Sequence, residues 1–263
     1  MMTRKEIDTQ EWYDFIGELS GVLPGIHLGG ENATKELVSL CHIDETSYVL
    51  DVGCGSGNTA CEVAKEYHAR VVGIDLSEAM IRKAIERAKK EDVADKVDFR
   101  VQTVFELPFS DHTFDVALSE SVLTPLLGEK INAIREIVRV LRPSGLLGIN
   151  ESIVDFEPSP EIIELLDKHP AINGFFTTSN LRQLIENSGL KIIEFKEYME
   201  PSSTTLREIG FRNLLSFMLF SYPKVIWKLL RDSRFRRAQK VDNMINKHLK
   251  EYGGYVLLVG QKS

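Results

Sequence analysis

The alternation of short apolar segments with helical patterns is the feature that most restricts the fold of this chain. The segments with strand character are 47–53, 70–75, 97–103, 114–120, 146–152, 191–199 and 254–262. Helical patterns cover 31–42, 58–67, 76–91, 129–141 and 178–188. Because parallel neighbours need a crossover connection, and a helix usually supplies it, this order predicts a doubly wound α/β fold. Its sheet should be mainly parallel and covered on both faces.

The interval 200–251 does not follow this alternation. It is too long for an ordinary connection between two strands, and helical patterns fill most of it. We therefore expect a helical lid over 200–251, inserted before the last strand of a single domain that spans 1–263. The core of that domain should consist of 31–199 and 252–263.

The composition is that of an ordinary globular protein, with 43% hydrophobic and 27% charged residues among 263. The cysteines, Cys41, Cys54 and Cys61, are odd in number and lack CxxC spacing. This argues against a disulfide scaffold or a zinc site and favours a reducing compartment. The start of the chain is too polar for a signal peptide, and no run of about 18 apolar residues exists to span a membrane. These features predict a cytoplasmic protein without a bound metal.

The charge is unevenly spread along the chain. Residues 222–250 hold nine Lys and Arg against two Asp, a net charge of +7, so the rest carries −14 within the total of −7. The negative total argues against a general nucleic-acid partner. The basic segment fits a solvated helix face, an anionic membrane surface or an anionic substrate. A peripheral membrane contact would extend over 211–250, because the stretch before the basic segment is apolar and aromatic.

The sequence VLDVGCGSGNT places a glycine-rich turn between a strand and a helix. Its pattern is D-x-G-x-G-x-G, with Asp51, Gly53, Gly55 and Gly57. The dinucleotide fingerprint G-x-G-x-x-G needs a glycine where this chain has Asn58, so a dehydrogenase is disfavoured. The Lys-Ser/Thr ending of a P-loop is missing, which argues against an NTPase. The turn favours a nucleoside ligand without a pyrophosphate.

Two acidic residues next to this turn define that ligand further. Glycines let the backbone approach a ligand closely, and Asp51 can accept a hydrogen bond from an ammonium group. Asp75 ends the second strand, where its two oxygens can accept from both hydroxyls of a ribose. An amino acid, a ribose and an adenine make up S-adenosylmethionine, which these groups fit.

At these residues the chain resembles the class I S-adenosylmethionine-dependent methyltransferases, in particular those that act on small molecules. VLDVGCGSG is similar to their first motif, and VVGIDLSEAM to the strand and helix start that carry the ribose acid. LPFSDHTFDVALSESVL resembles the segment around their fourth strand, and VLRPSGLLGI the turn into their fifth. The resemblance covers 49–150 and fits 178–199 and 253–262 by strand order. It implies a Rossmann-like sheet of seven strands, mainly parallel, with the last strand antiparallel.

The resemblance also implies cofactor contacts position by position. In the family, the residues of the glycine turn line the methionine part, Asp75 holds the ribose, and Leu76 and Met80 pack against adenine. Val104 offers its backbone N–H to the adenine ring. Thr103 stands where the family often has an aspartate that accepts from the adenine amino group, and its hydroxyl is a shorter, uncharged acceptor. The implied cofactor residues are Asp51, Gly53, Cys54, Gly55, Asp75, Leu76, Met80, Thr103, Val104 and Ser119.

The acceptor side is expected at the end of the fourth strand and in the N-terminal region. Ser119 and Glu120 end that strand and, by the resemblance, face the region of methyl transfer. GIHLGGENATKELV is similar to a segment of some small-molecule members in which H-P-G-G is common; leucine replaces the proline here. In such enzymes the N-terminal region, here 1–30, folds over the cofactor as a cap. Candidates for a general base are therefore His27, Glu120 and Tyr13, although many acceptors need none.

We expect a methyltransferase that aligns a small, apolar or anionic acceptor with the electrophilic methyl group of S-adenosylmethionine and excludes water. The product would be S-adenosylhomocysteine. Two alternatives stay open: a protein that binds S-adenosylmethionine without transferring its methyl group, and a membrane-associated methyltransferase of a lipid or quinone-like acceptor.

Overall fold

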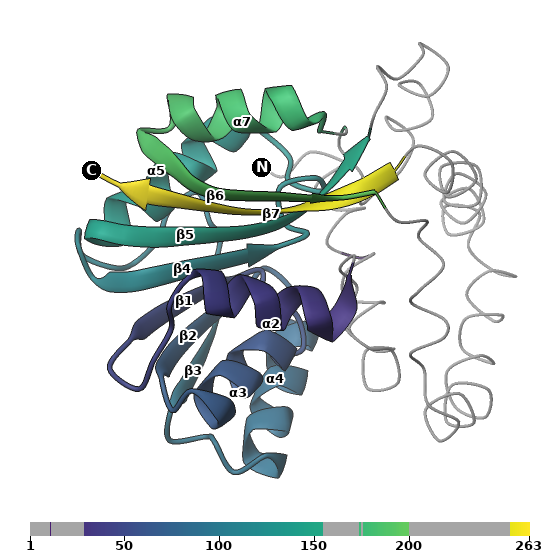
Figure 1. The fold of residues 1–263 in the computed structure, drawn as a ribbon. Helices are drawn as coiled ribbons and strands as arrows, with labels where there is room; N and C mark the ends of the chain where they lie inside the picture. The colour runs from purple at the N-terminus through teal and green to yellow at the C-terminus, as the bar shows by residue number, and fades with distance from the viewer. Residues whose placement is uncertain (1–10, 12–28, 155–173, 175, 200–252) are drawn as a thin grey trace, which may run out of the picture.

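A computed structural model of the chain describes residues 11, 29–154, 174, 176–199 and 253–263. Its core is a seven-stranded sheet in the order β3-β2-β1-β4-β5-β7-β6 (Figure 1). The strands are β1 (Tyr48–Val52), β2 (Arg70–Asp75), β3 (Val97–Val101), β4 (Phe114–Glu120), β5 (Leu141–Val154), β6 (Leu190–Tyr198) and β7 (Gly253–Lys262). Helices among these residues include α2 (Gly30–Leu40), α3 (Asn58–Glu66), α4 (Glu78–Lys90), α5 (Lys130–Val140) and α7 (Thr178–Asn187).

The strand directions agree with the sequence prediction. The strands β3, β2, β1, β4 and β5 pair in parallel, whereas β7 is antiparallel to both β5 and β6. The predicted Rossmann-like, mainly parallel sheet of seven strands with an antiparallel last strand is therefore confirmed.

The clearest difference from the predicted elements lies at the start of β5. The sequence RPSG at 142–145 predicts a turn before the strand, but β5 already begins at Leu141, which pairs with Phe114. The register then shifts, and regular pairing resumes where Val116 meets Leu146. The turn thus lies within the strand, because β4 pairs with the chain on both sides of it.

Helices cover both faces of the sheet: α2, α3 and α4 lie on one face, and α5 and α7 on the other (Figure 1). The central strand β1 shows how the sequence produces this arrangement. Its fully buried Leu50 shares a hydrophobic cluster with Ile134 of α5, whereas the neighbouring Val49 shares one with Leu37 of α2. Successive side chains point to opposite faces, so both faces of this strand must be apolar.

The carboxyl ends of β1, β2 and β4 meet at one edge of the sheet, because these strands are parallel neighbours. The glycine turn follows β1, Asp75 ends β2 and Glu120 ends β4. Two residues after Asp75, Ser77 accepts a hydrogen bond from Met80 N–H at 3.2 Å and caps the start of α4. Ligands of open α/β sheets bind outside this edge, so the fold brings the candidate residues to a suitable place.

Several predicted features lie outside the described residues. The N-terminal cap over 1–30 does so almost entirely, and the lid over 200–251 and the membrane contact over 211–250 do so completely. These parts of the domain organisation therefore stay predictions. Within the described part of the chain, no helix is both long and apolar enough to cross a membrane.

Candidate active site

The glycine turn after β1 depends on the absence of side chains. Gly53, Gly55 and Gly57 have φ angles of 67°, 53° and 77°, in the left-handed region that glycine adopts without strain. A methyl group on Gly53 would come within 2.5 Å of Val122 Cγ2, so this glycine allows close packing. A methyl group on Gly55 would meet no described atom within 4 Å. As far as the described residues go, the backbone at Gly55 therefore borders space into which a ligand can fit.

Asp75 holds the turn against the end of β2. Its Oδ2 accepts from Gly55 N–H at 3.0 Å, and its Oδ1 accepts from Ser77 N–H at 2.8 Å. A second tie joins Cys54 N–H to the carbonyl of Ile74 at 2.9 Å. The residue predicted to hold a ribose thus also shapes the glycine turn.

Asp51 is a buried carboxylate at the end of β1. Among the described residues, its Oδ2 has no hydrogen-bond partner, and neither does the buried hydroxyl of Ser119 at the end of β4. Burial, followed by the nearby charges of Glu120 and Asp75, raises the pKa of Asp51 well above its usual value; a backbone hydrogen bond from Ala60 opposes the shift. Buried polar atoms without partners are rare and need an explanation. A cationic ligand group would supply one for Asp51.

Glu120 joins three elements around the site. Its Oε2 accepts from the Thr34 hydroxyl of α2 at 2.9 Å and from Asn150 Nδ2 of β5 at 3.3 Å, and its Oε1 accepts from the Thr59 hydroxyl of α3 at 2.8 Å. Thr34, Thr59 and Asn150 are all buried. Sequence reasoning missed these three partners, because only the fold brings residues so far apart in the chain together. The carboxylate is therefore held by at least three donors.

The loop after β4 is held by a second buried carboxylate, which the sequence analysis did not single out. Glu151 of β5 accepts from the N–H of Leu123 at 2.8 Å, from the Thr124 hydroxyl at 2.7 Å and from Ser152 N–H at 3.2 Å. Burial raises its pKa, and these hydrogen bonds oppose the shift. Lys130 donates to carbonyls of the same loop, including that of Leu126 at 3.0 Å. The one available signal was an acidic residue inside the apolar run LLGINES.

The predicted adenine side presents apolar surface at the ends of β2 and β3. Leu76, Val101 and Phe105 are large apolar residues that are 55%, 48% and 39% exposed. Val101 pairs with Asp75 in the sheet, so this surface adjoins the predicted ribose residue. Met80 and Val104 are buried. An apolar ring placed here would cover surface that otherwise contacts water.

Of the other predicted residues, the structure describes Cys54 and Thr103. Cys54 is buried, and burial followed by the charges of Asp51 and Asp75 raises the pKa of its thiol well above the usual value. This environment disfavours a thiolate nucleophile and fits a small residue in a tight turn. The Thr103 hydroxyl accepts from Phe105 N–H at 3.3 Å. Tyr13 and His27 lie outside the described residues.

The charges of the site suit a positively charged ligand. Asp51, Asp75 and Glu120 lie close enough for the latter two to raise the pKa of the first. S-adenosylmethionine carries a sulfonium and an ammonium group, so its amino-acid end would meet an excess of negative charge. Within the described residues, the uncovered backbone at Gly55, the Asp51 Oδ2 without a hydrogen-bond partner and the exposed Leu76 would suit its three parts.

Comparison with known proteins gives a consistent result. The family model described as "Methyltransferase domain" matches residues 49–145. The O-methyltransferase rstn1 of Aspergillus nomiae is 30% identical over 182 residues, which are 67% of this chain and 79% of the relative.

Two solved structures share the fold. The [4+2]-cyclase SpnF superposes with a TM-score of 0.75 at 21% identity, over 99% of this chain and 96% of SpnF. A methyltransferase from Geobacter sulfurreducens, solved with S-adenosylhomocysteine, superposes with a TM-score of 0.64 at 20% identity, over 89% of this chain and 91% of the other. The motifs, the sheet order and the relative from Aspergillus nomiae together show that this chain belongs to the class I S-adenosylmethionine-dependent methyltransferases, with S-adenosylmethionine as its cofactor.

Proposed function

We propose that the chain transfers the methyl group of S-adenosylmethionine to a small molecule, and that a hydroxyl group is the acceptor to test first. The O-methyltransferase name of the relative from Aspergillus nomiae supports the choice of oxygen. An apolar or anionic acceptor remains our expectation for the molecule as a whole. When bound, the cofactor supplies an electrophilic methyl group on its sulfonium.

In this proposal, each cofactor part has its own residues. Asp51 accepts from the ammonium group, and the backbone of Gly53, Cys54 and Gly55 lies along the methionine part. Asp75 accepts from the ribose hydroxyls. The remaining assignments are Leu76, Met80, Thr103 and Val104 for adenine, and Ser119 for the region of methyl transfer.

Glu120 acts in this proposal as a positioning residue. Its three donors, Thr34, Thr59 and Asn150, hold the carboxylate in place. A general base must be free to take a proton from the acceptor, and this arrangement favours a structural role. Tyr13 and His27 remain the candidates for a base where the acceptor needs one.

The observation that carries the proposal is the buried Asp51 Oδ2, which has no partner among the described residues. Binding to the native state raises the melting temperature, so S-adenosylmethionine and S-adenosylhomocysteine should each raise it, whereas NAD should not. A radiolabelled methyl group should then pass to hydroxylated acceptors in a substrate panel. A shift with NAD and none with the adenosyl ligands would contradict the proposal.

A second candidate function is binding of S-adenosylmethionine without methyl transfer. The fold shared with the [4+2]-cyclase SpnF supports this alternative, because one fold can serve different chemistries. Formation of S-adenosylhomocysteine that depends on an added acceptor would decide for methyl transfer. Tight binding without turnover across a broad acceptor panel would favour the alternative.

A membrane-associated methyltransferase of a lipid or quinone-like acceptor is the third candidate. The +7 charge of 222–250 supports it. Replacing Arg234, Arg236 and Arg237 by Gln should reduce binding to anionic liposomes or acceptor turnover, and leave cofactor affinity unchanged. If the triple variant equals wild type in liposome binding, acceptor turnover and cofactor affinity, the basic segment is only a solvated helix face.

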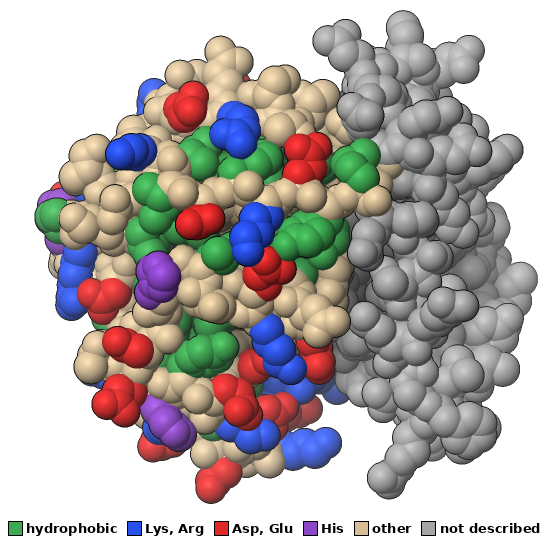
Figure 2. All heavy atoms as spheres, viewed as in Figure 1, with side chains coloured by type: hydrophobic (Ala, Val, Ile, Leu, Met, Phe, Trp, Pro, Cys, Tyr) green, Lys and Arg blue, Asp and Glu red, His purple; other side chains and the backbone are tan. Residues whose placement is uncertain are grey.

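Nucleic acid is not the proposed partner. Figure 2 shows acidic and basic side chains interspersed over this face of the described residues. A phosphate backbone needs a continuous basic surface, and the visible described face does not present one.

A further inference from the structure

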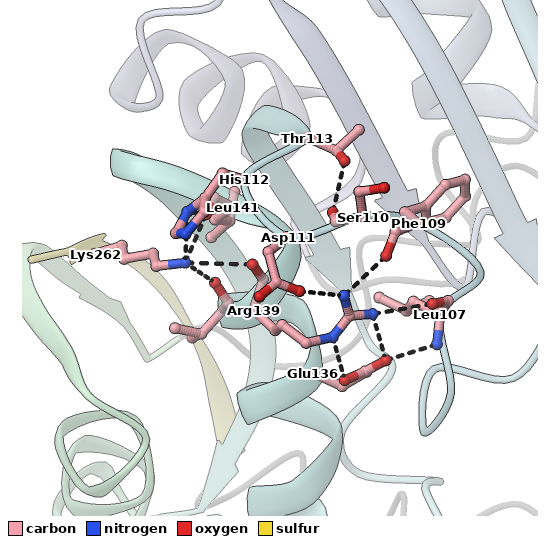
Figure 3. A network of polar contacts seen from close by, with 11 residues as sticks. Leu107, Phe109, Ser110, Asp111, His112, Thr113, Glu136, Arg139, Leu141 and Lys262 are labelled. Atoms are coloured by element: carbon pink, nitrogen blue, oxygen red, sulfur yellow. Dashed lines mark hydrogen bonds and ion pairs between the residues drawn. The ribbon is translucent and has the colours of Figure 1, made fainter.

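Arg139 in the last turn of α5 uses every N–H of its guanidinium group. A guanidinium has five N–H donors in a rigid plane. Arg139 donates from Nε and Nη2 to the two oxygens of Glu136 at 2.9 and 2.8 Å. It also donates to the carbonyls of Leu107 and Phe109 at 3.0 and 2.8 Å, and to Asp111 Oδ1 at 2.7 Å. Figure 3 shows this group reaching from α5 to the backbone of the segment 107–111.

The same pair of side chains holds both backbone groups of Leu107. Glu136 Oε1 accepts from Leu107 N–H at 2.8 Å, while Arg139 donates to Leu107 O. Leu107 itself is buried in the cluster that contains Ile134 and Ile137 of α5. The position of this backbone is therefore fixed by polar and apolar contacts with a single helix.

The predicted adenine residues, Thr103 and Val104, lie shortly before the segment held in this way. Before Thr103, Gln102 N–H donates to the carbonyl of Asp75 at 2.9 Å. The chain from 102 to 107 is therefore held at both ends. Thr103 and Val104 lie between these two anchors. A displacement of Leu107 would be transmitted to them, because only two residues separate Val104 from Leu107.

We propose that Glu136 and Arg139 are positioning residues for the adenine end of the cofactor site, acting through the backbone of Leu107. This inference rests on the proposed function, since that proposal assigns Thr103 and Val104 to adenine. It adds a role for two α5 residues that lie behind the site and do not contact the cofactor.

The chemistry of the two side chains makes the inference specific. The variant Arg139→Lys keeps the positive charge but loses the planar fork that reaches two carboxylates and two carbonyls at once. Glu136→Gln keeps an acceptor for Leu107 N–H and weakens the ion pair. Lys262→Met is a matched control for a general disturbance at the end of α5. Lys262 donates to the backbone carbonyls of Val138, Arg139 and Leu141 at 2.6, 3.3 and 2.7 Å, and it contacts neither Leu107 nor the side chains that hold it.

The test compares two ligands that differ in the adenine ring. Calorimetry with S-adenosylhomocysteine, and competition with S-ribosylhomocysteine, which lacks adenine, should be run on wild type and all three variants. Arg139→Lys should weaken S-adenosylhomocysteine binding about tenfold, the loss of roughly one hydrogen bond, and Glu136→Gln about threefold. Binding of S-ribosylhomocysteine should stay within about twofold. Lys262→Met should change neither affinity, even where it lowers the melting temperature.

Two results would overturn the inference. Equal weakening of both ligands by Arg139→Lys would indicate a general loss of structure, and unchanged S-adenosylhomocysteine binding would show that the contacts do not matter for adenine. If Arg139→Lys does not fold, Glu136→Gln decides by the same two readouts. A wild-type protein that binds both ligands equally would instead refute the adenine assignment of the proposed function, whatever the variants do.

Discussion

Two buried carboxylates, Asp51 and Glu151, lie near the same edge of the sheet and differ in how they are satisfied. Burial is the largest cause of a raised pKa at both. Glu151 accepts hydrogen bonds from the loop after β4, including those of Leu123 and Thr124. Asp51 keeps one oxygen without a partner among the described residues.

In the proposed function, this difference separates a structural acid, Glu151, from a binding acid, Asp51. A buried carboxylate is stabilised when hydrogen bonds replace its lost water, as they do for Glu151. In the ligand-free protein, no described residue replaces the lost water at Asp51 Oδ2, so part of the free-energy cost of burying this carboxylate remains. A cationic ligand group can remove this cost when it binds. The comparison predicts opposite consequences of mutation: loss of stability at Glu151 and loss of cofactor affinity at Asp51.

The largest expected effect is on stability at Glu151. Glu151→Ala leaves the buried N–H of Leu123 and the hydroxyl of Thr124 without their acceptor, so the free energy of unfolding should fall by about 3 kcal/mol. Urea denaturation measures this change. Glu151→Gln retains one side-chain carbonyl and should lose less. If Glu151→Ala unfolds at the wild-type urea concentration, the contrast with Asp51 has no basis.

The next largest expected effect is on cofactor affinity at Asp75. Like Glu151 it accepts hydrogen bonds from the backbone, and like Asp51 it binds the cofactor in the proposed function. Asp75→Ala should weaken binding of S-adenosylhomocysteine by about 1.5–3 kcal/mol, the range for hydrogen bonds to a charged group. The overall fold should remain, because Asp75 is only half-buried and lies at the end of β2. Calorimetry gives the affinity and circular dichroism the fold. Unchanged affinity would remove Asp75 from the site.

The smallest expected effect is the pH dependence that Asp51 contributes. Its native pKa is raised above the unfolded value of about 3.9. The stability that it contributes is therefore complete below that value and is lost as the pH rises through the native pKa. The ligand-free wild type should lose stability over this window more steeply than Asp51→Asn. The pKa of Glu151 is raised in wild type and in the variant alike, so a difference in slope between the two proteins is due to Asp51. Equal slopes would show that Asp51 does not contribute this pH dependence.

The sequence predicted the local parts of this molecule well. The strands follow from apolar runs, the helices from their periodic patterns, and the glycine turn from its spacing, because these signals depend on residues near each other in the chain. The partners of Glu120 and the contacts of Glu151 and Arg139 could not be predicted in this way. They join residues on different elements, and only the sheet order decides which elements meet. The register shift at the start of β5 has the same origin, since it depends on pairing with β4.

The most direct test of the account is calorimetric titration of S-adenosylhomocysteine into wild type, Asp51→Asn and Glu151→Gln. Asparagine keeps the shape of Asp51 and removes the charge available to the ammonium group. Asp51→Asn should weaken binding by about 1.5–3 kcal/mol, while the melting temperature without ligand should stay the same or rise. Glu151→Gln should show the reverse, a lower melting temperature with affinity nearly unchanged. Wild-type affinity in Asp51→Asn would contradict the claim that this buried carboxylate binds the cofactor.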